Sequence, residues 1–454
     1  MAQEKRYFGT DGIRGVANID PLTPQRMVQL GRALAKVFLP RQGHHRILIG
    51  KDTRLSGYMI EASLAAGITS MGLDVLLVGP LPTPGVAYLT KSMRVDAGVV
   101  ISASHNPFED NGIKIFGADG YKLPDSTELE IEDLLDLSVN IEPRDASSLG
   151  KAYRIDDALG RYTVYLKTSF PREFTLEGLR VGLDCANGAA YSVAPQTLEE
   201  LGAEVLCRGN GPNGRNINAG FGSLYPEVVR KLVLENNLDV GIALDGDADR
   251  ALLVDEQGNF LDGDMVLAIT AIDLKERGLL RVPKVVGTVM SNLGLEKFLR
   301  GHGIEVERTQ VGDRYVLERM LEIGSQVGGE QSGHTIFTDH STTGDGMLTA
   351  LTVLEIMFRR KRKLSELVAG FVKFPQKLIN IRVSSKPDLR TVPEIRKVLE
   401  QKENELRDNG RILVRYSGTE NKARVMVECE EEELCKRHAT DVAEVIERAI
   451  GKIV

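Results

Sequence analysis

One segment of this 454-residue chain joins a buried strand pattern to a reactive side chain. The apolar, β-branched run Val99–Ile101 is followed by the polar loop 104–107, which reads Ser-His-Asn-Pro. Ligands of open α/β sheets collect beyond the carboxyl ends of strands, so the Ser104 hydroxyl is placed to act as a nucleophile. The alternative is an ordinary turn, since Ser, Asn and Pro are common in turns. The chemistry that this placement favours is phosphoryl transfer.

A second candidate site is formed by three carboxylates at alternate positions. Asp245, Asp247 and Asp249 are separated only by Gly246 and Ala248, which let the backbone fold tightly. Magnesium takes oxygen ligands in octahedral geometry and keeps places for substrate phosphate, so this spacing predicts a Mg²⁺ site. A solvated acidic turn and a calcium loop are the alternatives. An EF-hand, however, requires further ligands and a glutamate at its twelfth position.

A glycine-rich loop, 329–334, holds one carboxylate and one hydroxyl between glycines. Glu330 and Ser332 are suited to hydrogen bonds with the hydroxyl groups of a sugar ring. A turn without any ligand is an equally open interpretation of these six residues, because glycine-rich loops are common.

A basic loop near the C-terminus combines two guanidinium groups with hydroxyls and a glycine turn. Arginine binds phosphate bidentately, and backbone amides of a turn add dipoles, so this loop predicts a site for a dianion. A hairpin turn with surface arginines is the alternative. The residues of this predicted phosphate cradle are Arg415, Ser417, Gly418, Thr419 and Arg424.

The same order of elements recurs three times before the last part of the chain: a strand, a helix, a second strand, a helical stretch, and a segment that ends in one of the loops described above. Such alternation predicts α/β sheets with parallel strands. The first copy has predicted strands at 46–49 and 74–78 and ends at Ser104. The second copy has predicted strands at 181–183 and 204–206 and ends at 240–249. The third copy has predicted strands at 285–287 and 304–307 and ends at 328–334.

The last part of the chain departs from this order. Strand patterns at 378–383, 411–416 and 423–429 frame one helix and precede a charged helix from Glu431, which predicts an α+β domain. The predicted fold is therefore three related mixed-sheet α/β domains plus a C-terminal α+β domain around a central cleft. The predicted boundaries are 1–155, 156–255, 256–370 and 371–454.

Composition narrows the class of protein. A hydrophobic content of 42% and a charged content of 27% are typical of a globular chain, and no apolar stretch is long enough to span a membrane. The net charge of −7 argues against a nucleic-acid partner. Four scattered cysteines do not predict a disulfide framework or a zinc site, and we expect a cytoplasmic location.

Taken together, the four loops resemble those of the α-D-phosphohexomutase family. Ser-Ala-Ser-His-Asn-Pro, Asp-Gly-Asp-Ala-Asp-Arg, Gly-Glu-Gln-Ser-Gly-His and Arg-Tyr-Ser-Gly-Thr-Glu occur in this order, one in each predicted domain. The resemblance covers essentially the whole chain.

The resemblance implies a mechanism in which Ser104 is a phosphoserine that exchanges its phosphoryl group with the sugar. A sugar 1,6-bisphosphate is then both intermediate and primer, and one Mg²⁺ per chain is held by Ser104, Asp245, Asp247 and Asp249. The resemblance also implies that Lys114, Arg14 and Arg250 stabilise charge on the transferring group and that His334 lies near the reacting end. It implies that Glu330 and Ser332 contact the sugar. The residues implied to bind the other phosphate are Arg415, Ser417, Gly418, Thr419 and Arg424.

Within the family, the segments 9–15, 311–316 and 328–334 resemble the branch that acts on glucosamine phosphates. Asp313 stands where members acting on mannose or glucose phosphates usually have a histidine. The implied reaction interconverts glucosamine 6-phosphate and glucosamine 1-phosphate, which supplies amino-sugar nucleotide and cell-wall precursor synthesis. Asn421 departs from the proline that many members have in the phosphate loop; it adds a donor and loosens the turn but removes no phosphate ligand.

Several alternatives remain open at this point. The same loops would serve a phosphomannomutase or phosphoglucomutase, and a phosphatase would let water intercept the phosphoserine. A non-catalytic sugar-phosphate-binding protein would have no need of a serine nucleophile beside three aspartates. The expected partner is a phosphorylated amino sugar, and the protein is expected to be a monomer or a homodimer.

Overall fold

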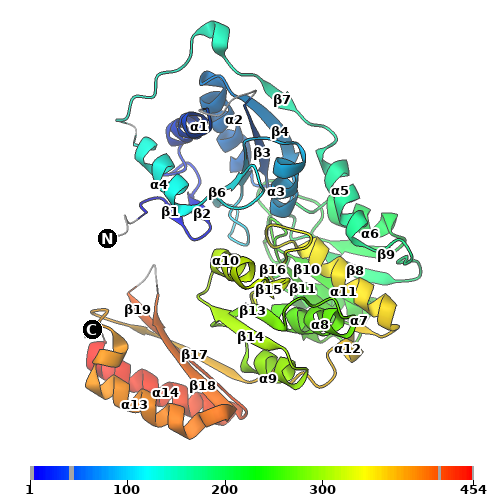
Figure 1. Cartoon of the computed structure of the whole chain (residues 1–454), viewed down its shortest axis with the longest axis vertical. Helices are drawn as coiled ribbons and strands as arrows, with labels where there is room; N and C mark the ends of the chain where they lie inside the picture. Colours follow the sequence, from blue (N-terminus) through cyan, green and yellow to red (C-terminus); the bar gives the residue numbers. More distant parts are fainter. Residues whose placement is uncertain (1–4, 40–44, 137, 418–420, 452–454) are drawn as a thin grey trace. The chain divides into compact units, whose positions relative to one another are not determined.

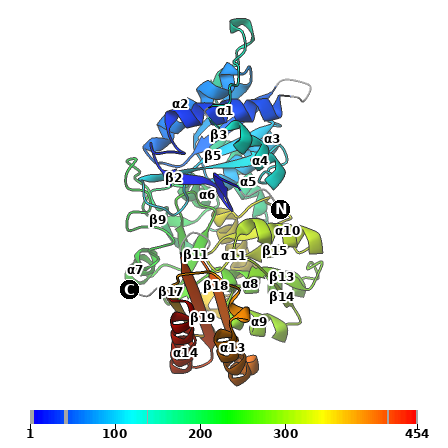
Figure 2. The same cartoon turned by 90° about the vertical axis from the view of Figure 1, so that its left-hand side faces the viewer.

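The structure, a computed structural model, describes residues 5–39, 45–136, 138–417 and 421–451. The chain divides into two compact units, and each is described by itself. The first comprises Met1–Thr288 with Glu307–Ala369, and the second comprises Val289–Val306 with Gly370–Val454. Figures 1 and 2 show the elements of both units from two sides. Every helix among the described residues is too short or too polar to serve as a membrane span.

The first sheet has seven strands, and its centre is parallel. The strand order is β1-β2-β6-β5-β3-β4-β7, with β3, β4, β5 and β7 parallel and β6 antiparallel to both β5 and β2. The strands are β1 (Phe8–Gly9), β2 (Gly12–Val16), β3 (Arg46–Lys51), β4 (Asp74–Pro80), β5 (Ala97–Ile101), β6 (Asp110–Gly117) and β7 (Ala152–Arg154). The helices are α1 (Pro24–Phe38), α2 (Ser56–Ser70), α3 (Thr83–Ser92) and α4 (Asp125–Leu134).

Two glycines let α1 and α2 pack closely. A Cβ atom at Gly31 would lie 2.5 Å from the Leu64 carbonyl oxygen, and one at Gly67 would lie 2.2 Å from the Val28 carbonyl oxygen. The apolar side chains of both helices then complete one buried core with β3 and β5. This core holds the strand end from which the loop of Ser104 begins.

The second and third sheets are smaller. The second has the order β12-β11-β10-β8-β9, and the third has the order β14-β13-β15-β16. Their strands are β8 (Arg180–Asp184), β9 (Glu204–Arg208), β10 (Val240–Leu244), β11 (Ala251–Asp255), β12 (Phe260–Leu261), β13 (Lys284–Thr288), β14 (Glu305–Thr309), β15 (Val327–Gly329) and β16 (Thr335–Phe337). Their helices are α5 (Ala158–Ser169), α6 (Val193–Glu200), α7 (Glu227–Asn236), α8 (Gly263–Glu276), α10 (Asp313–Ile323), α11 (Gly346–Arg360) and α12 (Leu364–Leu367).

One arrangement recurs in all three sheets of the first unit. A fully buried strand is followed by a loop and then by an antiparallel neighbour: β5 with β6, β10 with β11, and β15 with β16. The connecting loops are those that contain Ser104, the three aspartates and Glu330. The prediction of three related mixed-sheet α/β domains is confirmed. The four predicted domain boundaries and the central cleft stay predictions.

The second unit contains an antiparallel sheet with the order β17-β19-β18. Its strands are β17 (Gln376–Arg382), β18 (Gly410–Tyr416) and β19 (Lys422–Cys429), and its helices are α9 (Leu293–Gly301), α13 (Pro393–Leu406) and α14 (Glu432–Ile450). Apolar residues of α13, α14 and β19 form one core. The predicted α+β architecture is confirmed, and all four cysteines are free thiols.

Candidate active site

Ser104 lies just beyond the carboxyl end of β5, as the sequence predicted. Its side chain is fully buried, and its Oγ donates a hydrogen bond of 2.6 Å to Asp245 Oδ2, which lies in the loop between β10 and β11. Its backbone is left-handed, with φ of +51°. This conformation costs a non-glycine residue about 1–2 kcal/mol, so the surrounding contacts must hold it.

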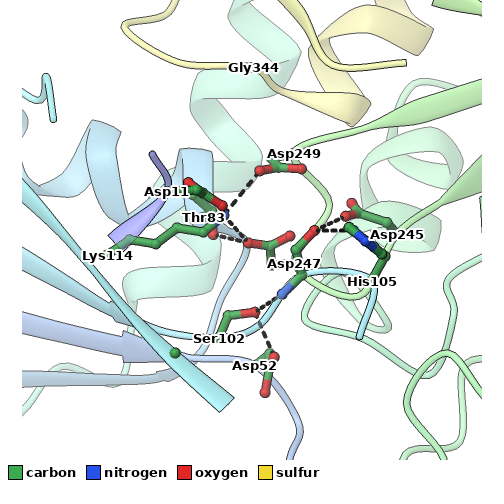
Figure 3. A network of polar contacts seen from close by, with 12 residues as sticks. Asp11, Asp52, Thr83, Ser102, His105, Lys114, Asp245, Asp247, Asp249 and Gly344 are labelled. Carbon is green, nitrogen blue, oxygen red and sulfur yellow. Dashed lines mark hydrogen bonds and ion pairs between the residues drawn. The ribbon is translucent and has the colours of Figure 1, made fainter. Parts of the chain in front are cut away.

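The three aspartates form one buried cluster, shown in Figure 3. One oxygen from each of Asp245, Asp247 and Asp249 lies within 4.8 Å of the others. Asp247 Oδ1 and Asp249 Oδ1 are buried without a hydrogen-bond partner among the described residues, although Arg250 Nε lies 3.6 Å from the latter. Buried carboxylate oxygens without donors are suited to a cation, so these residues fit a Mg²⁺ ion.

Lys114 supplies the positive charge nearest to this cluster. It lies on β6, and its Nζ is 2.9 Å from Asp247 Oδ2 and 3.2 Å from both Asp249 Oδ2 and Asp11 Oδ2. Burial opposes the ammonium form, but the three carboxylates outweigh it and raise the pKa of Lys114 well above its ordinary value. The lysine is therefore a fixed cation.

The cluster carries unevenly distributed charge. Burial, followed by the charges of Asp249 and Asp247, raises the pKa of Asp245 well above its ordinary value. Burial also acts on Asp249, but Lys114 and His334 outweigh it and hold the pKa of Asp249 well below the ordinary value. Asp245 is therefore the carboxylate with the least compensation from protein cations.

A polar cavity of about 400 Å³ opens beside the cluster, and its volume falls in the range of small-molecule sites. It contains five side chains that the sequence predicted for the site: Arg14, Asp249, Arg250, Glu330 and His334. Ser104 is fully buried and is not among the residues that line the cavity. The complete lining is Tyr7, Gly9, Thr10, Asp11, Gly12, Arg14, Asp249, Arg250, Val311, Gly312, Asp313, Glu330 and His334.

Backbone amides orient the loop between β15 and β16. Gly312 N donates to Glu330 Oε1 at 3.0 Å, and Gly344 N donates to His334 Nε2 at 3.2 Å. The other ring nitrogen of His334 lies 3.6 Å from Asp249 Oδ2. Burial opposes protonation of His334, but Asp249 and Asp313 raise its pKa. Ser332 is exposed at the edge of the loop.

Sequence reasoning missed two members of this site. Asp11 contacts Lys114 and Arg14, and Lys122 Nζ lies 2.6 Å from Asp11 Oδ1 and 2.5 Å from Asp313 Oδ2. Burial opposes the charged form of Asp11, yet Lys114 and Lys122 hold its pKa well below the ordinary value. The sequence feature that could have indicated Asp11 as a site residue is its position in the same glycine-rich segment as Arg14.

Gly246 sets the separation between the Ser104 loop and the aspartate loop. A Cβ atom at Gly246 would lie 2.5 Å from the Ser104 carbonyl oxygen. We expect Gly246→Ala to push the loops apart and to lower the free energy of unfolding by about 1–3 kcal/mol, as overpacking does. Urea unfolding measures the loss. Gly211→Ala is the control, because a Cβ there would meet nothing within 4 Å, and equal stability of the two variants would contradict the expected clash.

The predicted phosphate cradle is described only in part, since Gly418 and Thr419 lie outside the described residues. Arg415 on β18 pairs directly with Arg424 on β19. Burial and the charge of Arg424 lower the pKa of Arg415. Lys386 Nζ donates to the Ser417 carbonyl at 3.0 Å, which adds a cation that sequence reasoning missed. Like charges opposite one another are unfavourable in a sheet, so this pair is suited to an anion.

This combination of fold and site agrees with comparisons to known proteins. Phosphoglucomutase/phosphomannomutase alpha/beta/alpha domains I, II and III match residues 5–139, 161–258 and 262–374, and the C-terminal domain matches residues 378–445. The chain belongs to the phosphoglucomutase/phosphomannomutase family.

Among its relatives are phosphoglucosamine mutases of two bacteria. The protein of Geobacter metallireducens is 57% identical over 449 residues, which cover 98% of this chain and 99% of that protein. The protein of Syntrophotalea carbinolica is 57% identical over 453 residues, which cover 99% and 98%.

Solved structures share the fold at lower identity. A phosphoglucomutase/phosphomannomutase family protein from Burkholderia thailandensis is 23% identical with a TM-score of 0.78, covering 97% of each chain. Aspergillus fumigatus N-acetylphosphoglucosamine mutase, solved in complex with GlcNAc-6P and magnesium, is 18% identical with a TM-score of 0.66 and covers 99% of this chain and 96% of that one.

Proposed function

We propose that this protein interconverts glucosamine 6-phosphate and glucosamine 1-phosphate through a phosphoserine. The observation that carries the phosphoryl-transfer chemistry is the hydrogen bond of 2.6 Å from the Ser104 hydroxyl to Asp245, in a buried cluster of three aspartates. The full-length relatives that are 57% identical support glucosamine phosphate as the substrate.

Ser104 is the group that accepts and donates the phosphoryl group. In the first transfer, a sugar hydroxyl oxygen forms a bond to phosphorus while the bond from phosphorus to Ser104 Oγ breaks. The sugar hydroxyl gives up one proton and Ser104 Oγ regains one, so a sugar 1,6-bisphosphate and a free serine result. The bisphosphate reorients and returns its other phosphoryl group to Ser104, which completes the isomerisation. A sugar 1,6-bisphosphate would therefore also prime an unphosphorylated chain.

The aspartates would hold the metal of this reaction. Asp245, Asp247 and Asp249, with an oxygen of the phosphorylated Ser104, would bind one Mg²⁺ per chain, since two of their buried oxygens lack other donors. When bound, the ion would neutralise negative charge on the phosphoryl oxygens and favour attack of a sugar hydroxyl on phosphorus. This assignment also explains why three buried carboxylates are tolerated so close together.

Protein cations complete the charge stabilisation. Arg14 and Arg250 line the cavity and Lys114 contacts the aspartates, so these fixed positive charges would lower the barrier to transfer without reorganisation. Arg250 also lies beside His105, since its Nη1 is 3.3 Å from His105 Nδ1. Burial and the cations Arg250 and Arg14 lower the pKa of His105 to about 4. His105 is therefore neutral near pH 7.

The remaining residues would bind the sugar and its second phosphate. Glu330 and Ser332 would form hydrogen bonds with ring hydroxyls, and His334 would lie at the reacting end of the sugar. Arg415, Ser417 and Arg424, with Gly418 and Thr419, would hold the phosphate that is not reacting. The cytoplasmic location and the oligomeric state stay predictions.

The test of the function is a comparison of kcat/KM for the 1- and 6-phosphates of glucosamine, glucose and mannose. The assay contains Mg²⁺ and the matching 1,6-bisphosphate, and Ser104→Ala serves as the blank. We expect a large preference for glucosamine phosphates. A preference for glucose or mannose phosphates would overturn the substrate assignment while keeping the chemistry. Release of inorganic phosphate in place of isomerisation would identify a phosphatase.

The cradle gives a separate prediction for Arg415→Ala. We expect KM for glucosamine 6-phosphate to rise by about 10- to 100-fold, because a charged hydrogen bond to phosphate is worth about 1.5–3 kcal/mol. Thermal stability should change little, since Arg415 is only partly buried. Steady-state kinetics measures the effect, with Arg396→Ala on the exposed face of α13 as the control. An unchanged KM would place the phosphate elsewhere.

A further inference from the structure

Arg54 is a buried arginine outside the cavity and outside every motif that the sequence indicated. It lies three residues beyond the end of β3, and its side chain is fully buried. A buried guanidinium group normally needs a carboxylate partner, and Asp52 Oδ2 accepts from Arg54 Nε at 2.8 Å. The other four N–H groups of the guanidinium donate to acceptors of a different kind.

All four remaining N–H groups donate to carbonyl oxygens of the loop that contains Ser104. Nη2 donates to Ser104 O at 3.0 Å and to Asn106 O at 2.8 Å. Nη1 donates to Asp110 O at 3.0 Å and also to Pro107 O. Arginine has five N–H donors in a rigid planar arrangement, and here one loop and one carboxylate use the whole set.

The carboxylate partner of Arg54 holds the same serine from its other side. Ser102 Oγ donates to Asp52 Oδ2 at 2.6 Å and accepts from Ser104 N at 2.9 Å, and Figure 3 shows the contact of Ser102 with Asp52. The backbone N–H and the backbone C=O of Ser104 are therefore both connected to the Arg54–Asp52 pair. These contacts hold both ends of the Ser104 backbone unit, whose φ of +51° is left-handed, and this backbone sets the direction of Oγ.

We infer that Arg54 is a positioning residue for phosphoryl transfer. It holds the Ser104 loop in the one conformation that directs Oγ toward Asp245, and it does so without touching substrate. This inference rests on the proposed function of Ser104 as the phosphoryl carrier. The consequence is that loss of the guanidinium impairs the transfer step, whereas substrate binding in the cavity is preserved.

A merely structural role for Arg54 is the competing explanation, and it predicts lower stability without a specific loss of turnover. One side chain from the loop between β9 and α7 holds the Ser104 loop in either case, because Asn218 Nδ2 donates to Ser104 O at 2.9 Å and to Asn106 O at 3.0 Å. Variants at Arg54 should therefore fold, while the position of the serine becomes less well defined.

Arg54→Lys is the first variant, because it keeps a positive charge beside Asp52. An ammonium group has three N–H donors, so it cannot serve Asp52 and four carbonyls together. We expect kcat to fall by about 100-fold, the size of effect that a displacement of about 1 Å in a reacting group produces. KM for the sugar phosphate should stay near the wild-type value. Wild-type kcat in Arg54→Lys would overturn the inference.

Arg54→Ala allows chemical rescue. Guanidinium ion, added at millimolar concentrations that do not denature the protein, should restore part of kcat, whereas methylammonium should not. The control is Leu30→Ala in α1, which removes fully buried apolar volume from the same domain. It should lower the melting temperature without changing kcat, and guanidinium should not stimulate it. Rescue of Leu30→Ala, or equal effects of the two ions on Arg54→Ala, would overturn the inference. If Arg54→Ala does not fold, the kcat and KM of Arg54→Lys test the inference by themselves.

A second readout separates this inference from the proposed function. Transfer of a labelled phosphoryl group from glucose 1,6-bisphosphate to Ser104 requires the transfer step but no particular sugar specificity. We expect this rate to fall in Arg54→Lys as much as kcat does. If wild-type protein takes no label, the proposed function fails. If wild type and Arg54→Lys take label at the same rate, only the role of Arg54 fails.

Discussion

Ser104→Ala should abolish isomerisation while the protein stays folded. We expect kcat to fall by about 10⁴-fold or more, because the variant has no oxygen to carry the phosphoryl group between the two ends of the sugar. The variant loses one hydrogen bond, from Oγ to Asp245, so its stability should change by only about 1–3 kcal/mol. Steady-state kinetics and thermal unfolding measure the two quantities.

A matched serine elsewhere serves as the control for this prediction. Ser63 on α2 is half-buried and donates one hydrogen bond, to the Met59 carbonyl at 2.8 Å. Ser63→Ala should keep full turnover. Mass spectrometry after incubation with glucose 1,6-bisphosphate should find one added phosphoryl group on wild type and on Ser63→Ala, and none on Ser104→Ala. Substantial residual isomerisation in Ser104→Ala would rule out the phosphoserine mechanism.

Asp245→Asn should have opposite effects on activity and on the stability of the metal-free protein. Burial and the neighbouring charges of Asp249 and Asp247 raise the pKa of Asp245, so its charged form is unfavourable in the folded protein. Neutral asparagine removes this repulsion, and the melting temperature without metal should rise. Activity should fall by about 100-fold or more, because the site loses one charged ligand.

Magnesium addition gives the decisive measurement for this site. A ligand at 100 times its dissociation constant stabilises the folded state by about 2.7 kcal/mol, so Mg²⁺ should raise the melting temperature of wild type. The shift should vanish in Asp245→Asn and persist in Glu235→Gln, which changes an exposed carboxylate on α7. EDTA should inactivate wild type reversibly. A full Mg²⁺ shift in Asp245→Asn would place the metal at other residues.

Features encoded within single elements were predictable. The β-branched run before Ser104 forms β5, because a strand buried on both faces needs apolar side chains at every position. The alternate aspartates of 245–249 form a tight loop between two strands, where Gly246 and Ala248 take little space. The strand patterns of the last domain correspond to β17, β18 and β19 within two residues at each end.

The partners of the chemical groups could not be read from the sequence in the same way. Ser104 and Asp245 are 141 positions apart, and Lys114 and Asp247 are 133 positions apart. Ser104, Asp245 and Asp247 follow the ends of their strands and Lys114 lies within β6, so only the packing of one sheet beside another decides which of these groups meet. A prediction of pairing at this distance needs either a known relative or the tertiary structure.

The sequence by itself therefore determined the reactive groups, the strands that carry them and the family, because these depend on side-chain type and on periodicity within an element. The tertiary structure alone decided that Lys114 meets Asp11 and that Arg54 holds the Ser104 loop. Arg54 donates mainly to backbone carbonyls, and every residue has one, so no side-chain pattern marks its targets. Hydrogen bonds to backbone groups depend on where those groups lie in space, and the folded chain alone sets these positions.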